Sequence, residues 1–513
     1  MIFLATWQWF ISMDRQELRA RAIDEVRRVR WFPAWGEARM LGMLESRPDW
    51  CISRQRSWGV PIPAVDCSAC GEAILTAALV ARAAAVFAEH GAEAWYERPI
   101  EEFLPADLRC PACGGASFTR EQDILDVWFD SGSSHEAVLG TRPELRWPAD
   151  LYLEGSDQYR GWFQSSLLVG VGGRGQAPYR QVLTHGFVVD EQGRKMSKSV
   201  GNTVAPQDVI SRSGAEILRL WAAMVDHREE VRIGPEILSR VVEAYRKIRN
   251  TCRILVANLY DFDPTVDLTP RARLEEIDRF ALARYEEAAR RILKAYEVYD
   301  YPTIFHTLNT LATVDLSAFY VDVSKDRLYT LAARSASRRS AQTTMYHVAD
   351  GLARLLAPIL PVSADELWQH LPGTRETSVH LAEFPSPPDP AGDAALLARW
   401  ERLLELREAV NAALEIKRKE KLIGNSLAAH VCLGASGEDL ALLERHRDDL
   451  AMLFIVSQVS VERRDGALAI DVHGAGGARC DRCWRVVPQV STDQAPSGIC
   501  SRCQDALAEP VNS

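Results

Sequence analysis

The spacing of the cysteines constrains this chain more than any other feature of its sequence. Of the 11 cysteines, eight lie in four pairs whose members are separated by two residues. These pairs are Cys67/Cys70, Cys110/Cys113, Cys480/Cys483 and Cys500/Cys503. Paired thiolates suit a tetrahedral zinc ion in a reducing compartment, whereas secreted disulfide scaffolds of this length do not concentrate cysteine in this way. The pattern predicts one to two zinc ions per chain and a cytoplasmic location.

The last two pairs form the more specific metal motif, because C-x2-C-x16-C-x2-C is zinc-ribbon spacing. The first two pairs are further apart, but Gly71 and Gly114 each follow the second cysteine of a pair, as in a zinc knuckle. We predict zinc at Cys480, Cys483, Cys500 and Cys503, and a second zinc at Cys67, Cys70, Cys110 and Cys113. Cys51, Cys252 and Cys432 are expected in the core.

Length and composition exclude several classes of protein. The chain has 513 residues, of which 47% are hydrophobic and 25% are charged, so it is globular with about three or four domains. No apolar run approaches the roughly 20 residues that span a bilayer, so we expect no membrane association. A net charge of −10 argues against a non-specific binder of nucleic-acid duplexes but leaves room for local basic patches.

The pattern of apolar residues changes near residue 230. From Trp50 to about Trp221, short apolar strands alternate with helices, which is typical of an α/β layered domain. Later, apolar residues three or four apart from Leu238 to Leu259 predict one buried helix face. Ser363 and Glu366 have the spacing of a helix capping box. A proline-rich linker, a long helix and short β-like runs are expected after residue 382.

The strongest chemical motif is Lys195-Met196-Ser197-Lys198-Ser199, which is flanked by Gly193 and Gly201. Two ammonium groups on a mobile loop can follow a polyphosphate as charge moves from its α- to its β-phosphorus. Such attraction counts most where it tightens in the transition state. For an arbitrary pair of lysines, a solvated surface loop is the simpler interpretation.

A second group of polar residues follows a predicted strand at Asp150–Leu153. Doubly wound folds place ligands at the carboxyl ends of their strands. Glu154 and Asp157 can hold an α-ammonium group or a ribose hydroxyl, Gln158 can donate and accept, and Trp162 offers a flat apolar wall. The simpler alternatives are an acid at a helix N-terminus for Glu154 and an ordinary core position for the tryptophan.

Together these motifs resemble the bacterial isoleucyl-tRNA synthetases, which are class I aminoacyl-tRNA synthetases. The resemblance covers essentially the whole chain. It rests on Trp50–Pro63, Asp126–His135, Tyr152–Phe163, Leu183–Val188, Arg194–Asn202, Tyr245–Pro264, Leu316–Thr330, Lys421–Leu427 and the Cys-x-x-Cys-Trp of the tail. The related families for valine and leucine share the lysine loop, but not the GSDQ-x-RGW stretch or this cysteine tail.

The resemblance implies ATP-dependent formation of isoleucyl-adenylate and transfer of isoleucine to tRNA-Ile, with Mg²⁺ accompanying ATP. It implies catalytic roles for Lys195, Ser197 and Lys198, the two lysines binding ATP. Contacts to the aminoacyl-adenylate are implied for Glu154, Gly155, Asp157 and Gln158. Trp162 and Trp58 would line the amino-acid side-chain pocket.

The resemblance also implies a domain order. The expected segments are an exit from the editing insertion (1–48), the C-terminal half of a Rossmann catalytic domain (49–230) with a zinc-ribbon insertion (64–120), a helical anticodon-binding domain (231–385), a small α/β junction domain (393–475) and a zinc ribbon (476–513). The fold class is thus α/β followed by all-α.

Basic residues gather in the helical part and in the tail. The clusters are Arg246/Lys247/Arg249/Arg253, Lys417/Arg418/Lys419/Lys421 and Arg479/Arg482/Arg485/Arg502, the last with Trp484 available to stack on a nucleotide. Each is by itself more typical of a solvated face, and the ribbon alone is compatible with a purely structural role. The resemblance implies that they help to hold tRNA.

The chain departs from the family pattern in one respect. Class I synthetases need an H-x-G-H element, and none of the 11 histidines forms it. The apolar start, Met1–Met13, resembles the edge of a core rather than a signal peptide. We therefore expect the C-terminal half of a synthetase, inactive alone and monomeric, with the N-terminal half as a possible separate partner. The alternatives are a non-catalytic tRNA-binding relic and a synthetase for valine.

Overall fold

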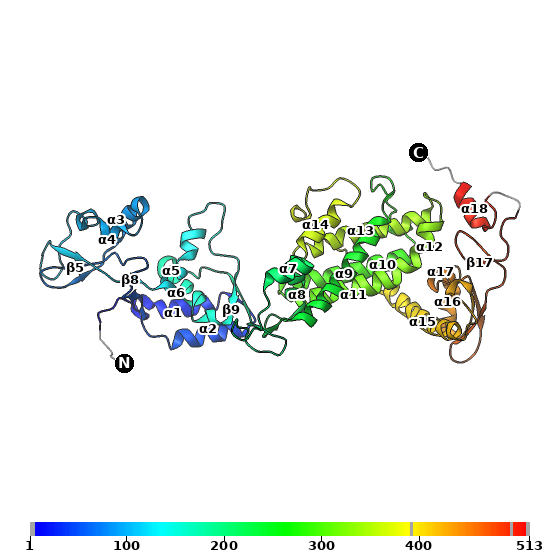
Figure 1. Ribbon diagram of the computed structural model, residues 1–513, viewed down its shortest axis with the longest axis horizontal. Helices are drawn as coiled ribbons and strands as arrows, with labels where there is room; N and C mark the ends of the chain where they lie inside the picture. Colours follow the sequence, from blue (N-terminus) through cyan, green and yellow to red (C-terminus); the bar gives the residue numbers. More distant parts are fainter. Residues whose placement is uncertain (1–5, 390–392, 493–495, 509–513) are drawn as a thin grey trace. The chain divides into compact units, whose positions relative to one another are not determined.

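The computed structural model describes residues 6–389, 393–492 and 496–508 (Figure 1). Contacts divide the chain into two compact units, Met1–Phe187 with His227–Val231, and Val188–Asp226 with Arg232–Ser513. Within the described ranges, no helix is both long enough and apolar enough to cross a membrane.

The first unit alternates short strands and helices. Its strands are β1 (Phe10–Ile11), β2 (Arg30–Phe32), β3 (Trp50–Cys51), β4 (Ser53–Arg54), β5 (Val65–Cys67), β6 (Ala73–Ile74), β7 (Phe118–Arg120), β8 (Ile124–Leu125), β9 (Tyr152–Gly155) and β10 (Gln181–His185). Its helices are α1 (Leu18–Val26), α2 (Trp35–Glu45), α3 (Ala77–His90), α4 (Ala94–Glu97), α5 (Val127–Gly132) and α6 (Trp162–Arg174).

A three-stranded parallel sheet in the order β2-β10-β9 organises this unit. Val182 of β10 lies opposite Trp31 on one side and Tyr152 on the other. Helix α6 follows β9 and buries Phe163 and Leu167 in the same core as these strands. A parallel sheet needs such helical cover, because its crossover connections run over its faces.

Residues between β5 and β7 form a small subdomain with its own core. The antiparallel sheet β6-β5-β7 and helix α3 enclose Trp95 and Phe103, whose rings meet edge to face at a centroid distance of 4.9 Å. Thr76 caps α3 by accepting a hydrogen bond from the Leu79 N–H. The subdomain brings the first two cysteine pairs together.

The second unit is mostly helical. Its helices are α7 (Pro206–Ser213), α8 (Ala215–Met224), α9 (Pro235–Ala257), α10 (Glu276–Glu297), α11 (Tyr301–Thr310), the π-helix η6 (Leu311–Val321), α12 (Asp322–Thr330), α13 (Ala336–Leu356), α14 (Pro361–Gln369), α15 (Ala394–Lys419), α16 (Gly437–Arg445), α17 (Leu450–Leu453) and α18 (Ser501–Ala508). Its strands are β11 (Val188–Val189), β13 (Ala429–Ala435), β14 (Gln458–Arg463), β15 (Ala469–Gly474), β16 (Ala478–Arg479) and β17 (Val486–Val487), and β12 (Val231–Arg232) lies at the boundary with the first unit.

The helical part packs around α10, which contacts α11, α13 and α15 (Figure 1). The predicted apolar face of α9 is confirmed, since Val241, Ile248 and Leu255 are buried. The junction sheet β14-β13-β15 shares this core, because Val431 and Leu433 belong to the same buried cluster as the helices. The predicted fold class, α/β followed by all-α, is therefore confirmed.

The predicted capping box at Ser363 is wrong. Helix α14 starts at Pro361, two residues earlier, and Ser363 lies inside it. Proline suits a first helical position because its ring presets φ and its missing N–H would have no helical partner there. The Ser363 hydroxyl instead hydrogen-bonds to Glu216 and Tyr245.

Candidate active site and metal centres

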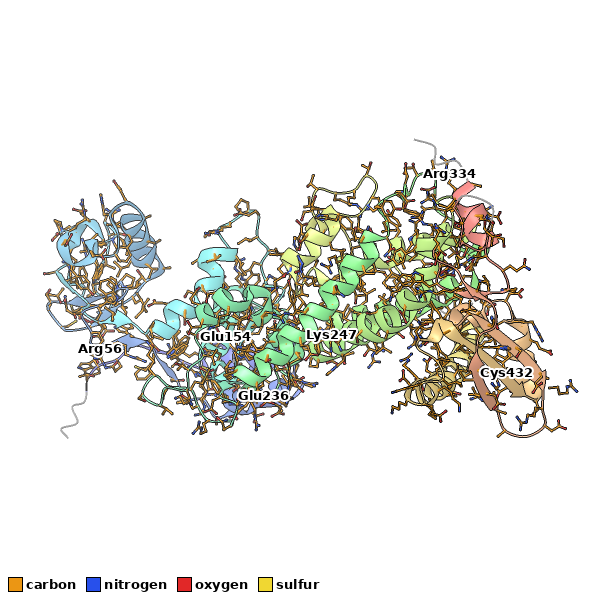
Figure 2. All side chains as sticks on the ribbon, turned by 45° about the vertical axis from the view of Figure 1, so that its right-hand side comes forward. Arg56, Glu154, Glu236, Lys247, Arg334 and Cys432 are labelled. Carbon is orange, nitrogen blue, oxygen red and sulfur yellow. The ribbon has the colours of Figure 1, made fainter. Side chains whose placement is uncertain are left out.

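The carboxyl end of β9 carries the first group of predicted site residues. Glu154 lies opposite Thr184 of β10, and Gly155 lies opposite His185. The exposed Glu154 carboxylate, labelled in Figure 2, accepts a hydrogen bond from the Gly155 N–H (3.0 Å) and has no ion-pair partner among the described residues. An unpaired carboxylate at this edge of a parallel sheet can bind an ammonium group or a hydroxyl.

In the loop after β9, the Asp157 side chain lies close to the backbone at Gly155. A Cβ atom on Gly155 would lie 2.8 Å from Oδ1 of Asp157, so a larger residue here would displace this carboxylate. Gln158 accepts a hydrogen bond from the Trp162 N–H (2.9 Å) and donates one to Asp157 (3.1 Å). The amide thereby satisfies one of the free N–H groups at the start of α6 and holds the loop against the helix.

The two predicted pocket tryptophans differ in their environments. The Trp162 ring stacks on Tyr152 at a centroid distance of 4.0 Å and an interplanar angle of 10°. Its indole N–H donates to the Ser131 carbonyl (3.0 Å) and the Ser134 hydroxyl (3.1 Å). Trp162 is therefore a fixed wall, whereas Trp58 is 88% exposed.

The predicted lysine loop is closed by Asp190 and Asn202. The buried Asp190 carboxylate accepts hydrogen bonds from the Asn202 amide (2.9 Å), the Arg194 guanidinium (2.9 Å) and the Arg194 N–H (2.8 Å). Asn202 in turn accepts from the Ser197 N–H (2.9 Å) and donates to the Lys195 carbonyl (3.2 Å). The backbone that carries both lysines is thus tied at its base.

The hydrogen bonds to Asp190 lower the pKa of its carboxyl group. The Asn202 amide and the Arg194 groups stabilise the carboxylate more than its burial opposes it, so the pKa of Asp190 falls to about 2.

Lys195 and Lys198 are exposed and have no ion-pair partner in the described part of the chain. The positive φ angles of Gly193 (77°) and Gly201 (71°) allow the chain to turn on each side.

The strand-end residues and the lysine loop belong to different units. Glu154, Gly155, Asp157, Gln158 and Trp162 lie together in the first unit, whereas Lys195, Ser197 and Lys198 lie together in the second. Each group is thus assembled by local contacts of its own.

The first cysteine tetrad has the geometry of a metal site. The four Sγ atoms lie within 4.8 Å of one another, with Cys67 3.6 Å from Cys113 and Cys70 3.5 Å from Cys110. A tetrahedral zinc ion with bonds of about 2.3 Å places its sulfur ligands about 3.8 Å apart.

The second tetrad is more enclosed, because all four of its cysteines are buried. Cys480 lies 3.8 Å from Cys503, and Cys483 lies 3.9 Å from Cys500, close to the tetrahedral spacing. All 11 cysteines lie in the described ranges, and none of them forms a disulfide. Both tetrads therefore fit zinc, as the spacing predicts.

Most of the predicted basic clusters are internally paired. In the first cluster, Lys247 pairs with Glu243 (2.7 Å), Arg249 makes two bonds to Glu366 (2.6 and 2.8 Å) and Arg253 donates to Asn250. In the second cluster, Lys417 pairs with Glu420 and Arg418 with Glu415. Paired surface cations attract phosphate less strongly than free ones, so the clusters are weaker candidates than their residue counts suggest.

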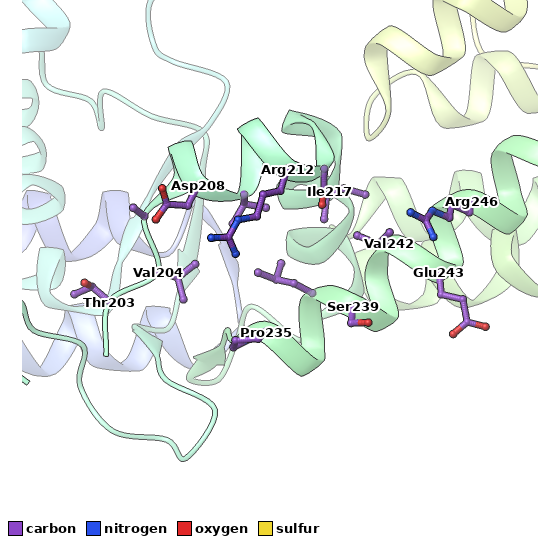
Figure 3. Close-up of a pocket in the computed structure, with 14 residues that line it drawn as sticks. Thr203, Val204, Asp208, Arg212, Ile217, Pro235, Ser239, Val242, Glu243 and Arg246 are labelled. Atoms are coloured by element: carbon purple, nitrogen blue, oxygen red, sulfur yellow. The ribbon is translucent and has the colours of Figure 1, made fainter. Parts of the chain in front are cut away.

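Arg246 is the exception in its cluster. It is exposed, lacks an ion-pair partner within the described ranges and lines a cavity of about 680 Å³ together with Arg212 (Figure 3). The floor of this cavity is apolar and includes Val209, Ile217 and Leu238. Sequence reasoning missed Arg212, because it stands outside any basic run.

A second cavity, of about 520 Å³, lies beside the C-terminal tetrad. Trp484 and Tyr329, 59% and 60% exposed, both line it. Trp484 has a φ of 61°, a left-handed conformation that disfavours residues with a side chain. Gly71 and Gly114 occupy the matching place after a knuckle in the first tetrad, with φ of 75° and 73°. A tryptophan at Trp484, where the two cysteine pairs of the first tetrad are followed by Gly71 and Gly114, is the sequence signal that points to this cavity.

Three parts of the chain match known families. Residues 1–234 match the tRNA synthetases class I (I, L, M and V). Residues 278–433 match the anticodon-binding domain of tRNA ligase, and residues 477–506 match the zinc finger found in FPG and IleRS.

Curated relatives match nearly the whole chain. The isoleucine–tRNA ligase of Syntrophotalea carbinolica is 51% identical over 519 residues, and that of Geobacter sulfurreducens is 50% identical over 517 residues. Each comparison covers 99% of this chain and 56% of the relative. The chain thus spans just over half the length of these relatives.

Among solved structures, a Mycobacterium tuberculosis methionyl-tRNA synthetase in complex with methionyl-adenylate is similar with a TM-score of 0.52 and 18% identity. The similarity covers 75% of this chain and 68% of that one. At this identity the likeness shows a shared fold.

Proposed function

We propose that this chain is part of a class I tRNA synthetase and takes part in attaching isoleucine to tRNA-Ile, because residues 1–234 match that family and the chain is 51% and 50% identical to two isoleucine–tRNA ligases. In the first step the isoleucine carboxylate attacks the α-phosphorus of ATP and pyrophosphate leaves. In the second step a hydroxyl of the terminal tRNA ribose attacks the acyl carbon and AMP leaves.

Lys195 and Lys198 would bind the phosphates of ATP, which enters with Mg²⁺. Both ammonium groups are unpaired among the described residues, so they can follow the charge that develops on the leaving pyrophosphate. Ser197 lies between them, with its N–H held by Asn202 and its hydroxyl 3.1 Å from that of Ser199. The absence of an internal partner for either lysine is the observation that carries the proposal.

The strand-end residues would bind isoleucyl-adenylate. The unpaired Glu154 carboxylate suits the α-ammonium group, and Gly155 allows Asp157 to lie close to the backbone beside it. Asp157 and Gln158, which hold each other, would bind the ribose or the carbonyl. Trp162 supplies a fixed apolar wall for the isoleucine side chain, and the exposed Trp58 would have to close onto it.

The helical part and the C-terminal ribbon would hold tRNA. Arg246 and Arg479 are the exposed, unpaired arginines of their clusters within the described ranges. Arg479 also lies over the ring of Trp484, 5.8 Å from its centroid. A phosphate at these arginines and a base stacked on Trp484 would match the usual recognition of unpaired RNA.

We further propose a one-to-one complex with a polypeptide that supplies the H-x-G-H element, acting in the cytoplasm. The eight paired cysteines favour that compartment, because free thiols and zinc–thiolate sites persist under reducing conditions.

The test is isoleucine-dependent exchange of labelled pyrophosphate into ATP. The purified chain is assayed alone and together with the part of the Syntrophotalea carbinolica relative that lies outside the matched 56%. We expect exchange only with that part present, and faster exchange with isoleucine than with valine. Lys198→Ala should slow exchange by about 10²- to 10³-fold, the usual effect of removing one transition-state charge contact.

Lys294→Ala, at an exposed lysine on α10, is the matched control and should leave exchange unchanged. Faster exchange with valine would point to a valine enzyme. Absence of exchange under every condition, with tRNA-Ile binding retained, would instead identify a non-catalytic tRNA-binding protein.

A further inference from the structure

Two arginines of the C-terminal ribbon converge on one carboxylate of the helical part, and a third binds the end of the same helix. Asp326 lies on α12, and its two oxygens accept a two-pronged pair of hydrogen bonds from Arg502 (2.6 and 2.8 Å). The Arg485 guanidinium reaches the same carboxylate at 3.1 Å. Such charge-assisted, two-pronged contacts are the strongest class of hydrogen bond in proteins.

The end of the same helix binds the third arginine. Arg482 donates to the carbonyl oxygen of Thr330, the last residue of α12, and Arg502 also donates to the Thr330 hydroxyl (3.3 Å). Carbonyls at a helix C-terminus lack helical partners and carry partial negative charge, so cations are favourable there. The contacts occupy arginines whose spacing alone suggested RNA binding.

Each of these arginines lies within two residues of a cysteine of the C-terminal tetrad. Arg482 lies between Cys480 and Cys483, Arg502 precedes Cys503, and Arg485 lies two residues after Cys483. A metal ion that draws the four sulfurs together also sets the direction of the three guanidinium groups. The sulfur spacing of this tetrad fits zinc, as described above.

We call the contacts of these three arginines with Asp326 and Thr330 the dock. Residues of the dock also line a cavity. Trp484 lies between Cys483 and Arg485, and Tyr329 lies next to Thr330, so both cavity-lining rings are adjacent to docking residues. Trp484 keeps its side chain despite the left-handed backbone that glycine adopts at the equivalent knuckle positions. A strained residue that persists at the mouth of a cavity points to a use for its side chain.

We propose that Asp326 is a positioning residue that couples metal binding at the C-terminal tetrad to docking of the ribbon on α12. Loading of the tetrad aims the three arginines at Asp326 and Thr330, and this dock completes the cavity between Trp484 and Tyr329. Docking in turn slows loss of the metal. The coupling goes beyond the proposed function and holds whatever the cavity binds.

The test compares Asp326→Asn with Asp322→Asn in the full chain loaded with zinc. Asp322 lies one turn earlier on α12 and pairs with the exposed Lys325 at 2.7 Å, so it controls for removing a charge from the same helix. Zinc release to a chromogenic chelator should show two phases, one for each tetrad. We expect Asp326→Asn to speed the C-terminal phase roughly tenfold, with trypsin cleavage of the ribbon rising in parallel.

The phase from Cys67, Cys70, Cys110 and Cys113 should not change, because that subdomain makes no use of Asp326. Equal release rates in Asp326→Asn, Asp322→Asn and the unmodified chain would overturn the proposal. If Asp326→Asn folds poorly, Arg485→Gln replaces it. This variant leaves all four ligands in place and should accelerate the same phase several-fold; an unchanged phase would again overturn the coupling.

Discussion

At the scale of single residues, Asp190 shows how one buried carboxylate can shape a functional loop. It gathers bonds from the Asn202 amide and from two groups of Arg194, and Asn202 passes the constraint on to Lys195 and Ser197. The lysine side chains themselves remain exposed. The arrangement ties the base of the loop while the two ammonium groups that it carries stay exposed.

Replacing Asp190 should loosen this loop. The pKa of Asp190 is about 2, below its ordinary value of 3.8, so its stabilising contribution is complete above about pH 4 and is lost as the pH falls through 2. Trypsin cleavage after Lys198 should therefore be several-fold faster in Asp190→Asn at every pH from 6 to 9. Asp208→Asn, at an exposed residue of α7, should leave the rate unchanged, and a similar rate in all three chains would contradict the role of Asp190.

Replacing Trp484 by glycine should preserve the stability of the ribbon but weaken the binding of tRNA. Trp484→Gly removes the left-handed penalty of about 1 kcal/mol and should leave the ribbon as stable or more so in thermal unfolding. The same change removes a stacking surface, and stacking contributes about 1–3 kcal/mol per base. Affinity for tRNA-Ile, measured by filter binding at fixed salt, should fall about 5- to 150-fold. Unchanged affinity would contradict a stacking role.

At the scale of elements, a buried ionic network joins α10, α12 and α13. The Asp278 carboxylate is fully buried and accepts hydrogen bonds from Arg327 (2.7 and 2.8 Å), the Tyr320 hydroxyl (2.7 Å) and the Ser340 hydroxyl (2.5 Å). Burial lowers the pKa of Arg327, but attraction to Asp278 more than offsets this, so that pKa is raised. The network fixes how these three helices meet.

Breaking this network from one side should be costly. Asp278→Ala leaves the Arg327 guanidinium buried without its main partner, and we expect the free energy of unfolding to fall by about 3–5 kcal/mol. Urea unfolding followed by circular dichroism measures the loss. Asp322→Ala removes the half-buried partner of the exposed Lys325 and should cost at most about 1 kcal/mol. Equal effects of the two substitutions would show that the buried network is not special.

At the scale of the whole chain, one buried core of the second unit includes residues from two predicted domains, 231–385 and 393–475. Trp400 of α15, beyond the proline-rich stretch, stacks on Phe280 of α10 at 5.1 Å, and its indole N–H donates to Glu276 (3.0 Å). The junction sheet contributes Val431 to the same buried cluster. The proline-rich composition predicts a linker, but apolar side chains on both sides of it pack together because each can bury more surface that way.

Local patterns in the sequence were enough to predict both cysteine tetrads, the lysine loop, the strand-end residues and the order α/β then all-α. Their signals lie in spacing: two residues between zinc ligands, three or four between buried helix positions, and short motifs at strand ends. Only the tertiary structure decided which charges are free. Arg482, Arg485 and Arg502 are docked on Asp326 and Thr330, which lie more than a hundred residues earlier, whereas Arg246 and Arg479 have no such partner in the described ranges. Ion pairing is set by proximity in space, and short-range sequence patterns do not encode which distant carboxylate a guanidinium will meet.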